Sequence, residues 1–449
     1  MNILRQIIIV YFLVILSVST VTAEVIKDTK PNILLFTIDA CRFDHFSCYG
    51  YSRETTPNID KLAEEGIIFT NAFSQSAWTT PSMITIFTSL YPPVHNVDAK
   101  GKTLKEDIAT LPEVLKQKGY VIPVLPRFVD IPNYWHLGFD EVDKKQFSSF
   151  NPEEVEDLIK LIETYKEQSF FIWYHYHGLH LPYNPPEPYD KLFMKVISTG
   201  TVTERPAILD IKKKSVVKNG SVNFKDEDKN IIVSLYDGQV KQMDDDVGKI
   251  IGKIKEFGIL DNTLIILTSD HGEELLEHGF VGHASTSLNA KLYDEIIHIP
   301  LIIWYPKILK HKKIEDIAQQ IDIMPTVLDL LELSVPDGLQ GHSLLPLMQK
   351  QHSDDSNFSS GSLAQETVFC ETILGGYQST KEMEQIKMRC LRTKEWKLIY
   401  TKEPDSDKYE LYDLKTDPKE QRNVIEKYPD VRNELRKKLQ YWIGTTQPR

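Results

Sequence analysis

The sequence predicts an α/β fold: a doubly wound, mostly parallel sheet flanked by helices, followed by a smaller C-terminal subdomain. Short, uniformly apolar segments alternate with amphipathic segments through most of the chain. Uniformly apolar strands are typical of a parallel sheet that helices cover on both faces. With 449 residues, the chain is long enough for one large α/β domain and a second, smaller one.

Apolar runs of strand length carry the prediction of the large sheet. They are Asn32–Ile38, Phe170–His175, Thr263–Thr268 and Leu301–Trp304. Two helices are expected between these strands. Pro57–Gly66 begins with proline and ends with glycine, and Val233–Phe257 has apolar residues at helical spacing.

A polar, serine-rich stretch at 350–365 is expected to connect the two parts of the chain. Beyond it, four short segments predict a small antiparallel sheet: Thr367–Cys370, Met388–Leu391, Trp396–Tyr400 and Tyr409–Tyr412. A helix is expected at Pro429–Ile443. The predicted organisation is therefore a signal peptide at 1–23, a large α/β domain at 24–349, the connector, and a C-terminal α+β subdomain at 366–449.

The N-terminus has the three parts of a secretory signal peptide. A basic start, Met1–Arg5, precedes the apolar run Ile7–Val18 and the small-residue sequence Val21–Ala23. We expect cleavage after Ala23 and export to the periplasm or the medium. An uncleaved anchor is the alternative, although a membrane span needs about 20 apolar residues. No later segment of the sequence is long and apolar enough to span a membrane.

The net charge of −12 disfavours a general nucleic-acid binder, which needs a basic face to meet the phosphates. It does not disfavour a small anionic substrate, because a metal ion can reverse the local charge inside an acidic protein. The sequence does not decide between disulfides and free thiols for its four cysteines, Cys41, Cys48, Cys370 and Cys390.

Acidic residues directly follow two of the predicted strands. Asp39 comes after Ile33–Ile38, and Asp270 with His271 comes after Leu264–Ser269. Ligands of open parallel sheets bind beyond the carboxyl ends of the strands, so these three side chains are expected to converge. Each alone is compatible with a turn residue or a helix cap. Together, two carboxylates and one imidazole favour a divalent metal site.

A threonine stands at a predicted helix start. In Ser76–Met83, Pro81 suits the first helical turn, and Ile84–Ser89 continues the helix. Thr79 is then expected at the helix N-terminus, where free backbone N–H groups and the helix dipole attract anions. A metal can deprotonate a hydroxyl at such a position and make it a nucleophile. The alternative is that this sequence only caps a helix.

A set of motifs occurs in a fixed order between about residues 31 and 425. They are Asp39–His45, Ser47–Gly50, Thr56–Ala63, Gly66–Ala72, Thr79–Ser82 with Leu90–Pro92, Asp261–Thr263, Thr268–Glu273 with Glu277–Gly279, Trp396–Tyr400, and Glu410–Leu414 with Thr416–Pro418. Together they resemble the sulfatase family of the alkaline phosphatase superfamily. The resemblance implies that fold and an ester hydrolase activity that depends on a divalent metal.

The resemblance has departures at the site itself. Typical sulfatases read Cys-x-Pro-Ser-Arg, with the cysteine oxidised to formylglycine, but Thr79–Met83 reads Thr-Thr-Pro-Ser-Met, so formylglycine is not expected. The usual second aspartate is Ala40, and the usual Asp-Asn pair is Asp270 with His271. An acidic residue, a threonine nucleophile and an Asp-His pair instead resemble the metal site of phosphodiesterases and phosphoethanolamine transferases of the wider superfamily.

Two histidines match substrate-facing positions of these families. His180 resembles the histidine of the sulfatase His-x-Pro-Tyr element. His283 stands where sulfatases often have a substrate-binding lysine and the transferases have a histidine. Either is expected to protonate the leaving oxygen. A second metal held by both, with His175 or His177, is an alternative, although a structural role is favoured for the latter two.

The sequence therefore predicts a metal-dependent hydrolase of sulfate or phosphate esters, of the sulfatase or phosphodiesterase type. The predicted catalytic residues are Thr79, His180 and His283, and the predicted ligands of one Ca²⁺, Mn²⁺ or Zn²⁺ ion are Asp39, Thr79, Asp270 and His271. Expected substrates are a small anionic ester or a sulfated or phosphorylated glycan or lipid headgroup. A phosphoethanolamine-type transferase and a catalytically inactive binding protein are the alternatives.

Overall fold

The computed structural model describes residues 30–125, 137–141, 154–194, 205–217, 222–288, 291–350 and 366–446. The predicted signal peptide at 1–23 lies outside the described residues, as does the predicted connector apart from residue 350. Among the described residues, we find no helix with the length and apolar character that a membrane span requires.

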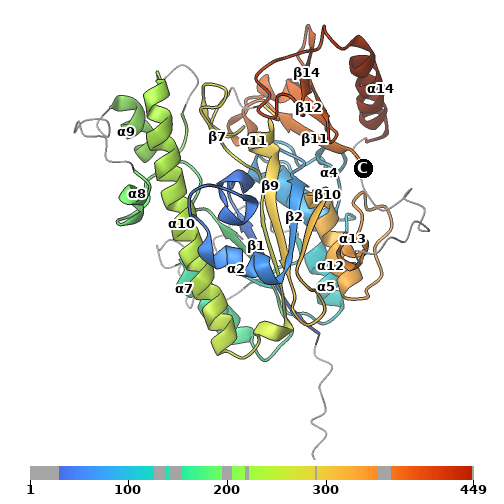
Figure 1. Cartoon of the computed structure of the whole chain (residues 1–449). Helices are drawn as coiled ribbons and strands as arrows, with labels where there is room; N and C mark the ends of the chain where they lie inside the picture. Colours follow the sequence, from blue (N-terminus) through green and yellow to red (C-terminus); the bar gives the residue numbers. More distant parts are fainter. Residues whose placement is uncertain are drawn as a thin grey trace, which may run out of the picture.

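Six strands form the central sheet, in the order β10-β2-β9-β6-β1-β5 (Figure 1). Their bounds are β1 Asn32–Ile38, β2 Ile67–Phe73, β5 Phe171–Tyr176, β6 Thr263–Ser269, β9 His298–Trp304 and β10 Lys312–Gln319. Three strand pairs, β1 with β5, β1 with β6, and β2 with β10, are parallel, whereas β9 runs antiparallel to both of its neighbours. The predicted α/β fold is confirmed, with one antiparallel strand inside the sheet.

Helices cover both faces of this sheet, so every residue of β1, β5, β6 and β9 is buried. On one side, the long helix α10 (Asp226–Glu256) contacts α2 (Pro57–Glu65) and α7 (Glu154–Tyr165) (Figure 1). Elsewhere, α3 (Thr79–Thr88) contacts α5 (Leu111–Gln117) and α12 (Ile323–Leu330). The shorter elements are α4 Pro92–His95, α8 Tyr189–Leu192, α9 Pro206–Lys213, α11 Asp294–Ile297, α13 Leu345–Gln349, β3 Pro123–Val124, β4 Asp140–Glu141, β7 Glu274–Leu275 and β8 Val281–Gly282.

Local chemistry explains the ends of two predicted helices. α2 ends before Gly66, where an added Cβ would lie 2.8 Å from the carbonyl oxygen of Ile303. Only glycine allows the chain to pass β9 so closely. α10 begins seven residues earlier than Val233, at Asp226, because Asp228 accepts the Lys225 N–H at 2.8 Å and three acidic residues stabilise the first turn.

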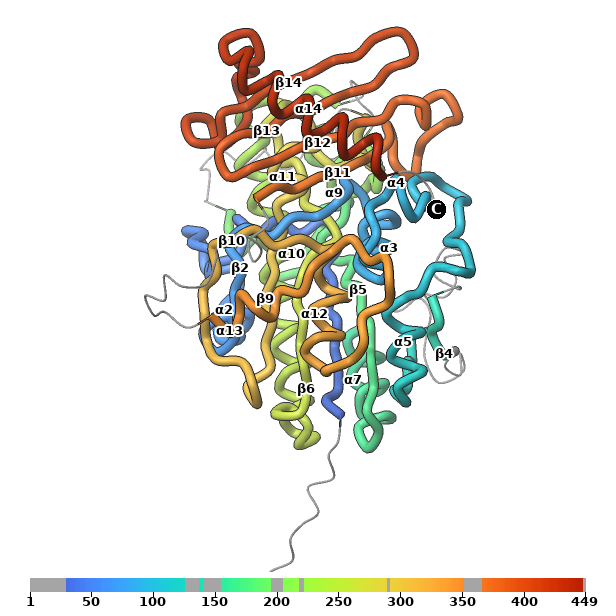
Figure 2. Tube along the Cα trace, turned by 90° about the vertical axis from the view of Figure 1, so that its right-hand side faces the viewer, coloured from blue at the N-terminus to red at the C-terminus, as the bar shows by residue number. Residues whose placement is uncertain are grey.

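Four antiparallel strands and a final helix form the C-terminal part, as predicted (Figure 2). They are β11 Val368–Ile373, β12 Lys387–Arg392, β13 Trp396–Lys402, β14 Asp407–Asp413 and α14 Pro429–Thr445. The N–H of Glu371 on β11 donates to the Gln75 carbonyl at 3.0 Å. This contact holds the small sheet against the segment that leads into α3. The four cysteines all carry free thiols.

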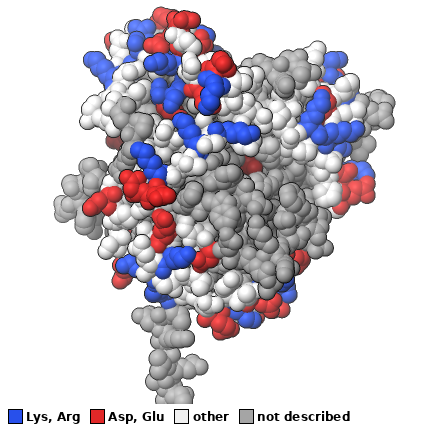
Figure 3. Space-filling model, turned by 180° about the vertical axis from the view of Figure 1, so that it is seen from behind, with Lys and Arg blue, Asp and Glu red and all other residues white. Residues whose placement is uncertain are grey.

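Basic and acidic side chains are interspersed on the face of the molecule seen in Figure 3. The described residues of this face form no broad basic patch. Inside the molecule, isolated ions are costly and need partners of opposite charge.

A buried ion cluster joins the two sheets. Lys397 on β13 is 0% exposed and contacts Asp294 at 2.8 Å and Glu420 at 3.0 Å. Arg392 adds a second cation, 3.0 Å from Asp294. Burial alone would lower the pKa of Lys397, but the two carboxylates outweigh burial and raise it. Because Asp294 begins α11, directly before β9, this cluster ties the C-terminal sheet to the central one.

We expect Lys397→Met to lower the free energy of unfolding by about 3–5 kcal/mol, because it leaves two buried carboxylates without their shared cation. Lys402→Met, at the exposed end of the same strand, should change this free energy by less than about 0.5 kcal/mol. Urea unfolding measures both variants. Equal effects would contradict a special role for the buried cluster.

Candidate active site

The candidate site lies where β1, β5 and β6 end, on the side of the central sheet that faces the C-terminal sheet (Figures 1 and 2). Parallel pairing places Ile38 of β1 level with Tyr176 of β5 and Ser269 of β6. Asp39 directly follows β1, and Asp270 directly follows β6. The register of the sheet therefore brings the two carboxylates together, as the sequence predicts.

Both carboxylates are buried and only partly hydrogen-bonded. Asp39 is 3% and Asp270 is 0% exposed. Oδ1 of Asp270 accepts the N–H of Ala40 at 3.1 Å and of His271 at 2.7 Å. Asp39 Oδ1 and Asp270 Oδ2 have no hydrogen-bond partner among the described residues. Buried charged oxygens of this kind call for a cation.

His271 completes a group that can hold a divalent metal. Its Nε2 lies 3.3 Å from Asp270 Oδ2 and 3.8 Å from Asp39 Oδ1. Its Nδ1 lies 2.8 Å from the Gly272 carbonyl, which only accepts, so Nδ1 carries the proton and Nε2 presents a lone pair. Burial lowers the pKa of His271, which favours the neutral ring that binds metals. Ligand atoms of the three residues lie within 4.8 Å of one another.

Thr79 is the first residue of α3 and is half-buried. Trp78, directly before the helix, has an extended backbone with φ of −163°. Thr79 Oγ1 lies 3.5 Å from Nε2 of His271. The structure thus brings the hydroxyl and the helix N-terminus to the two carboxylates and the imidazole that the sequence singles out.

A second group of side chains borders the first. The ring of His283, in the loop after β8, lies 4.3 Å from the ring of His271 and 4.9 Å from that of His180. Glu273, which is 0% exposed, places Oε1 3.0 Å from Nδ1 of His283. Sequence reasoning did not single out Glu273. The available signal was its position three residues after Asp270, on the same site loop.

The pKa values of the two histidines of this group are shifted in opposite directions. Burial, followed by the nearby His180, lowers the pKa of His283 to about 3. Burial also acts to lower the pKa of His180, but the Asp39 carboxylate and the Leu181 carbonyl outweigh it and raise this pKa above its ordinary value. Burial raises the pKa of Glu273 to about 8. Of these two histidines, His180 therefore keeps its proton to the higher pH.

Two further histidines lie against Asp39. His177 is exposed, and its Nδ1 lies 2.9 Å from Asp39 Oδ2. His175 is 2% exposed, and its Nδ1 lies 2.8 Å from the hydroxyl of Thr37. With Asp39, these histidines form a second group of potential metal ligands. The sequence alone favoured a structural role for both, since nothing in it showed which way the side chains at the end of β5 point.

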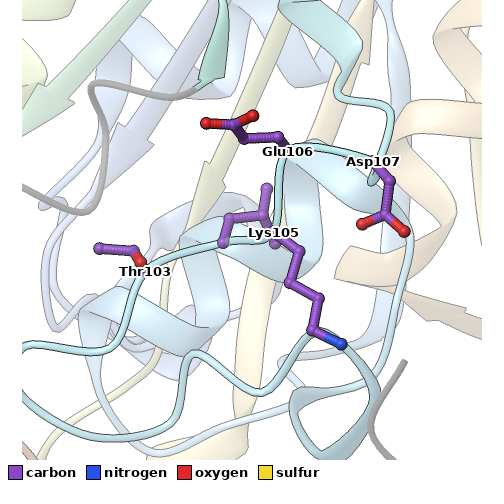
Figure 4. A pocket seen from close by; sticks show the side chains of 5 residues that line it. Thr103, Lys105, Glu106 and Asp107 are labelled. Atoms are coloured by element: carbon purple, nitrogen blue, oxygen red, sulfur yellow. The ribbon is translucent and has the colours of Figure 1, made fainter.

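An open depression elsewhere on the surface is lined by a single loop, Thr103–Asp107 (Figure 4). Lys105, Glu106 and Asp107 in this loop are exposed. None of its side chains belongs to the groups at the strand ends. The depression has no part in the site.

Comparison with known proteins agrees with this geometry. The Sulfatase family model matches residues 31–333, and the model of the N-sulphoglucosamine sulphohydrolase C-terminal region matches residues 289–444. The chain belongs to the sulfatase family, and it is an ester hydrolase of that family. An N-acetylglucosamine-6-O-sulfatase of Bacteroides thetaiotaomicron is 25% identical, in an alignment that covers 92% of this chain and 86% of that protein.

Solved structures share the fold over nearly the whole chain. The phosphonate monoester hydrolase of Agrobacterium radiobacter has a TM-score of 0.72 and 23% identity, with 93% of this chain and 96% of that one covered. A protein solved in complex with its substrate D-glucosamine-2-N,6-O-disulfate has a TM-score of 0.69 and 22% identity, with 93% and 98% covered. The central sheet and the C-terminal sheet are thus one known architecture.

Asp270→Asn should have opposite effects on thermal stability with and without metal. In the presence of a chelator, the substitution should raise the melting temperature, because it removes one of two neighbouring buried charges. With Mn²⁺ at about 100 times its dissociation constant, the unchanged protein gains about 2.7 kcal/mol, and the variant should lose most of this gain. Thermal melts with and without Mn²⁺ measure both effects.

Glu106→Gln, on the exposed loop, is the control for that experiment and should leave both melting temperatures unchanged. An equal stabilisation by Mn²⁺ in the unchanged protein and in Asp270→Asn would contradict a metal site at these strand ends.

Proposed function

We propose that the protein hydrolyses a monoanionic ester, either a sulfate monoester or a phosphodiester, with Thr79 as the nucleophile in a site that holds a divalent metal. One observation carries the proposal. The Thr79 hydroxyl, at the N-terminus of α3, lies 3.5 Å from His271 Nε2, beside two buried carboxylate oxygens that have no hydrogen-bond partner in the described part of the chain. Such a site can both activate a hydroxyl and stabilise charged oxygens.

The residues present fit a divalent ion. Asp39, Asp270, His271 and Thr79 would hold it through two carboxylate oxygens, a neutral imidazole nitrogen and a hydroxyl oxygen. When bound, the ion supplies positive charge that lowers the pKa of the hydroxyl and polarises the ester. The separations of 3.3, 3.5 and 3.8 Å between His271 Nε2 and the three oxygens suit ligands of one ion.

The charge of the site favours a substrate with one negative charge. A divalent ion balances Asp39 and Asp270, and Glu273 is mostly neutral at pH 7 because burial raises its pKa to about 8. His180, whose pKa is raised, supplies the remaining positive charge when it is protonated. Met83, which is fully buried, stands where typical sulfatases have an arginine. One cationic side chain complements a sulfate monoester or a phosphodiester better than the dianion of a phosphate monoester.

The chain's own groups account for both chemical steps. Thr79 loses its proton to solvent and attacks sulfur or phosphorus, and a bond to Thr79 Oγ1 forms as the bond to the leaving oxygen breaks. His180 donates its proton to that oxygen, which contributes about 10²–10⁴-fold. Its Nδ1 faces the Leu181 carbonyl at 2.6 Å, so Nε2 is the donor. Free N–H groups at the start of α3 stabilise the negative oxygens.

Water completes the reaction. Neutral His180 takes a proton from the water molecule that attacks the covalent ester on Thr79. The bond to Thr79 Oγ1 breaks, and inorganic sulfate or a phosphate monoester leaves. Thr79 then regains a proton from solvent, and the site returns to its starting state.

The names of relatives and the predicted export support a proposal for the substrate class. The Bacteroides relative is named for the 6-O-sulfate of N-acetylglucosamine, and a structural neighbour was solved with a glucosamine disulfate. A sulfated glycan met outside the cytoplasm is therefore the first candidate. The Asp270–His271 pair, in place of the sulfatase Asp-Asn pair, makes a phosphodiester the second.

The test is a parallel assay of the metal-loaded protein on an aryl sulfate, an aryl phosphodiester and an aryl phosphate monoester. We expect the sulfate or the diester to be turned over at least tenfold faster than the monoester. Thr79→Ala should lower kcat by about 10³-fold or more, because the nucleophile is lost. Thr79→Ser keeps a hydroxyl at the same place and is the matched control, with most of the activity retained.

Two outcomes contradict the proposal. A phosphate monoester as the best substrate would overturn the charge argument. Equal turnover by Thr79→Ala and the unchanged protein would remove Thr79 as the nucleophile.

A further inference from the structure

His175 presents a ring nitrogen to both carboxylates of the candidate metal site. It lies on β5, one residue before the strand ends, and is buried. Its Nε2 lies 3.8 Å from Asp39 Oδ2 and 3.8 Å from Asp270 Oδ2. These are the side chains that, with His271, form the first metal-binding group.

Neighbouring groups allow Nδ1 of His175 to carry the proton. The hydroxyl of Thr37 accepts the indole N–H of Trp173 at 2.9 Å and lies 3.4 Å from the Tyr174 carbonyl. An indole only donates and a carbonyl only accepts, so the hydroxyl can give its proton to Tyr174 and accept the Nδ1 proton of His175 at 2.8 Å. Nε2 then points a lone pair at the carboxylates.

The separations support this assignment. At 3.8 Å, Nε2 is too far from either carboxylate oxygen for a hydrogen bond from a protonated nitrogen. Two donor atoms that are each about 2.0–2.2 Å from one ion lie about 3–4 Å apart. The observed spacing therefore suits two ligands of a shared metal better than a salt bridge.

We propose that His175 Nε2 is a further ligand of this metal and makes the site select a transition ion such as Zn²⁺ or Mn²⁺ over Ca²⁺. The inference rests on the metal-dependent function proposed above and names its metal class. Ca²⁺ takes oxygen ligands, whereas imidazole nitrogen suits transition ions. Ala40, at the position of the usual second aspartate, supplies no side-chain oxygen. His175 thus adds a neutral nitrogen to a site with one carboxylate fewer.

The experiment measures metal binding directly. Metal-free protein is titrated with Zn²⁺ and with Ca²⁺ against a chromophoric chelator, and Co²⁺ serves as a spectroscopic probe of the ligand set. His175→Ala should weaken Zn²⁺ binding by about 10²-fold and alter the visible spectrum of the Co²⁺ protein, because a nitrogen ligand is lost. His175→Asp should shift the preference toward Ca²⁺, because it replaces nitrogen with oxygen.

His311→Ala is the matched control, since the His311 ring contacts the Ala63 carbonyl and belongs to neither group of metal ligands. It should bind Zn²⁺ as the unchanged protein does. Where His175→Ala does not fold, His175→Asn replaces it, because the shorter amide keeps a donor toward Thr37 without reaching the ion. Folding of each variant is checked by circular dichroism.

The outcomes separate this inference from the proposed function. Thr79→Ala should lose turnover and still bind Zn²⁺, because the four other proposed ligands, Asp39, Asp270, His271 and His175, remain. Unchanged Zn²⁺ affinity and an unchanged Co²⁺ spectrum in His175→Ala or His175→Asn would overturn the role of His175, even where Thr79→Ala is inactive. No binding of any divalent ion by the unchanged protein would overturn the metal-dependent function itself.

Discussion

The mutual repulsion of two buried carboxylates, Asp39 and Asp270, is the constraint around which the site is arranged. They end adjacent parallel strands, so the register of the sheet forces them together. Backbone N–H groups of Ala40 and His271 occupy one oxygen of Asp270, which leaves the oxygens that face the site to a cation. The proposed metal site and the proposed activation of the Thr79 hydroxyl rest on this concentration of negative charge. The Asp39 carboxylate also raises the pKa of His180.

A second cluster of buried carboxylates in the same molecule has a structural role, and cationic side chains offset its negative charge. Asp294 and Glu420, between the two sheets, are neutralised by Lys397 and Arg392. Around Asp39, by contrast, the contacts within the described residues come from histidines. An imidazole can become neutral and leave a carboxylate to bind a metal, whereas a lysine keeps its positive charge and stays paired with the carboxylate. This difference supports the proposal that the site around Asp39 binds a metal ion.

The sequence predicts the parts of this architecture that depend on local pattern. Strand-end aspartates and a threonine at a helix start were identified because the carboxyl ends of parallel strands share one edge. The antiparallel direction of β9 was not predicted, because hydropathy does not encode strand direction. β10 (Lys312–Gln319) was missed because it is an edge strand with several exposed residues. The contacts of His175 and Glu273 depend on side-chain direction, which only the folded chain defines.

We propose that Thr79 carries the sulfuryl or phosphoryl group during turnover. Intact-protein and peptide mass spectrometry of enzyme quenched with acid during turnover tests this most directly. We expect a transient mass increase of one sulfuryl or phosphoryl group on the peptide that contains Thr79. The increase should be absent without substrate and absent in Thr79→Ala. Active enzyme that carries the group on another residue, or rapid turnover in which no modified peptide forms at any quench time, would contradict it.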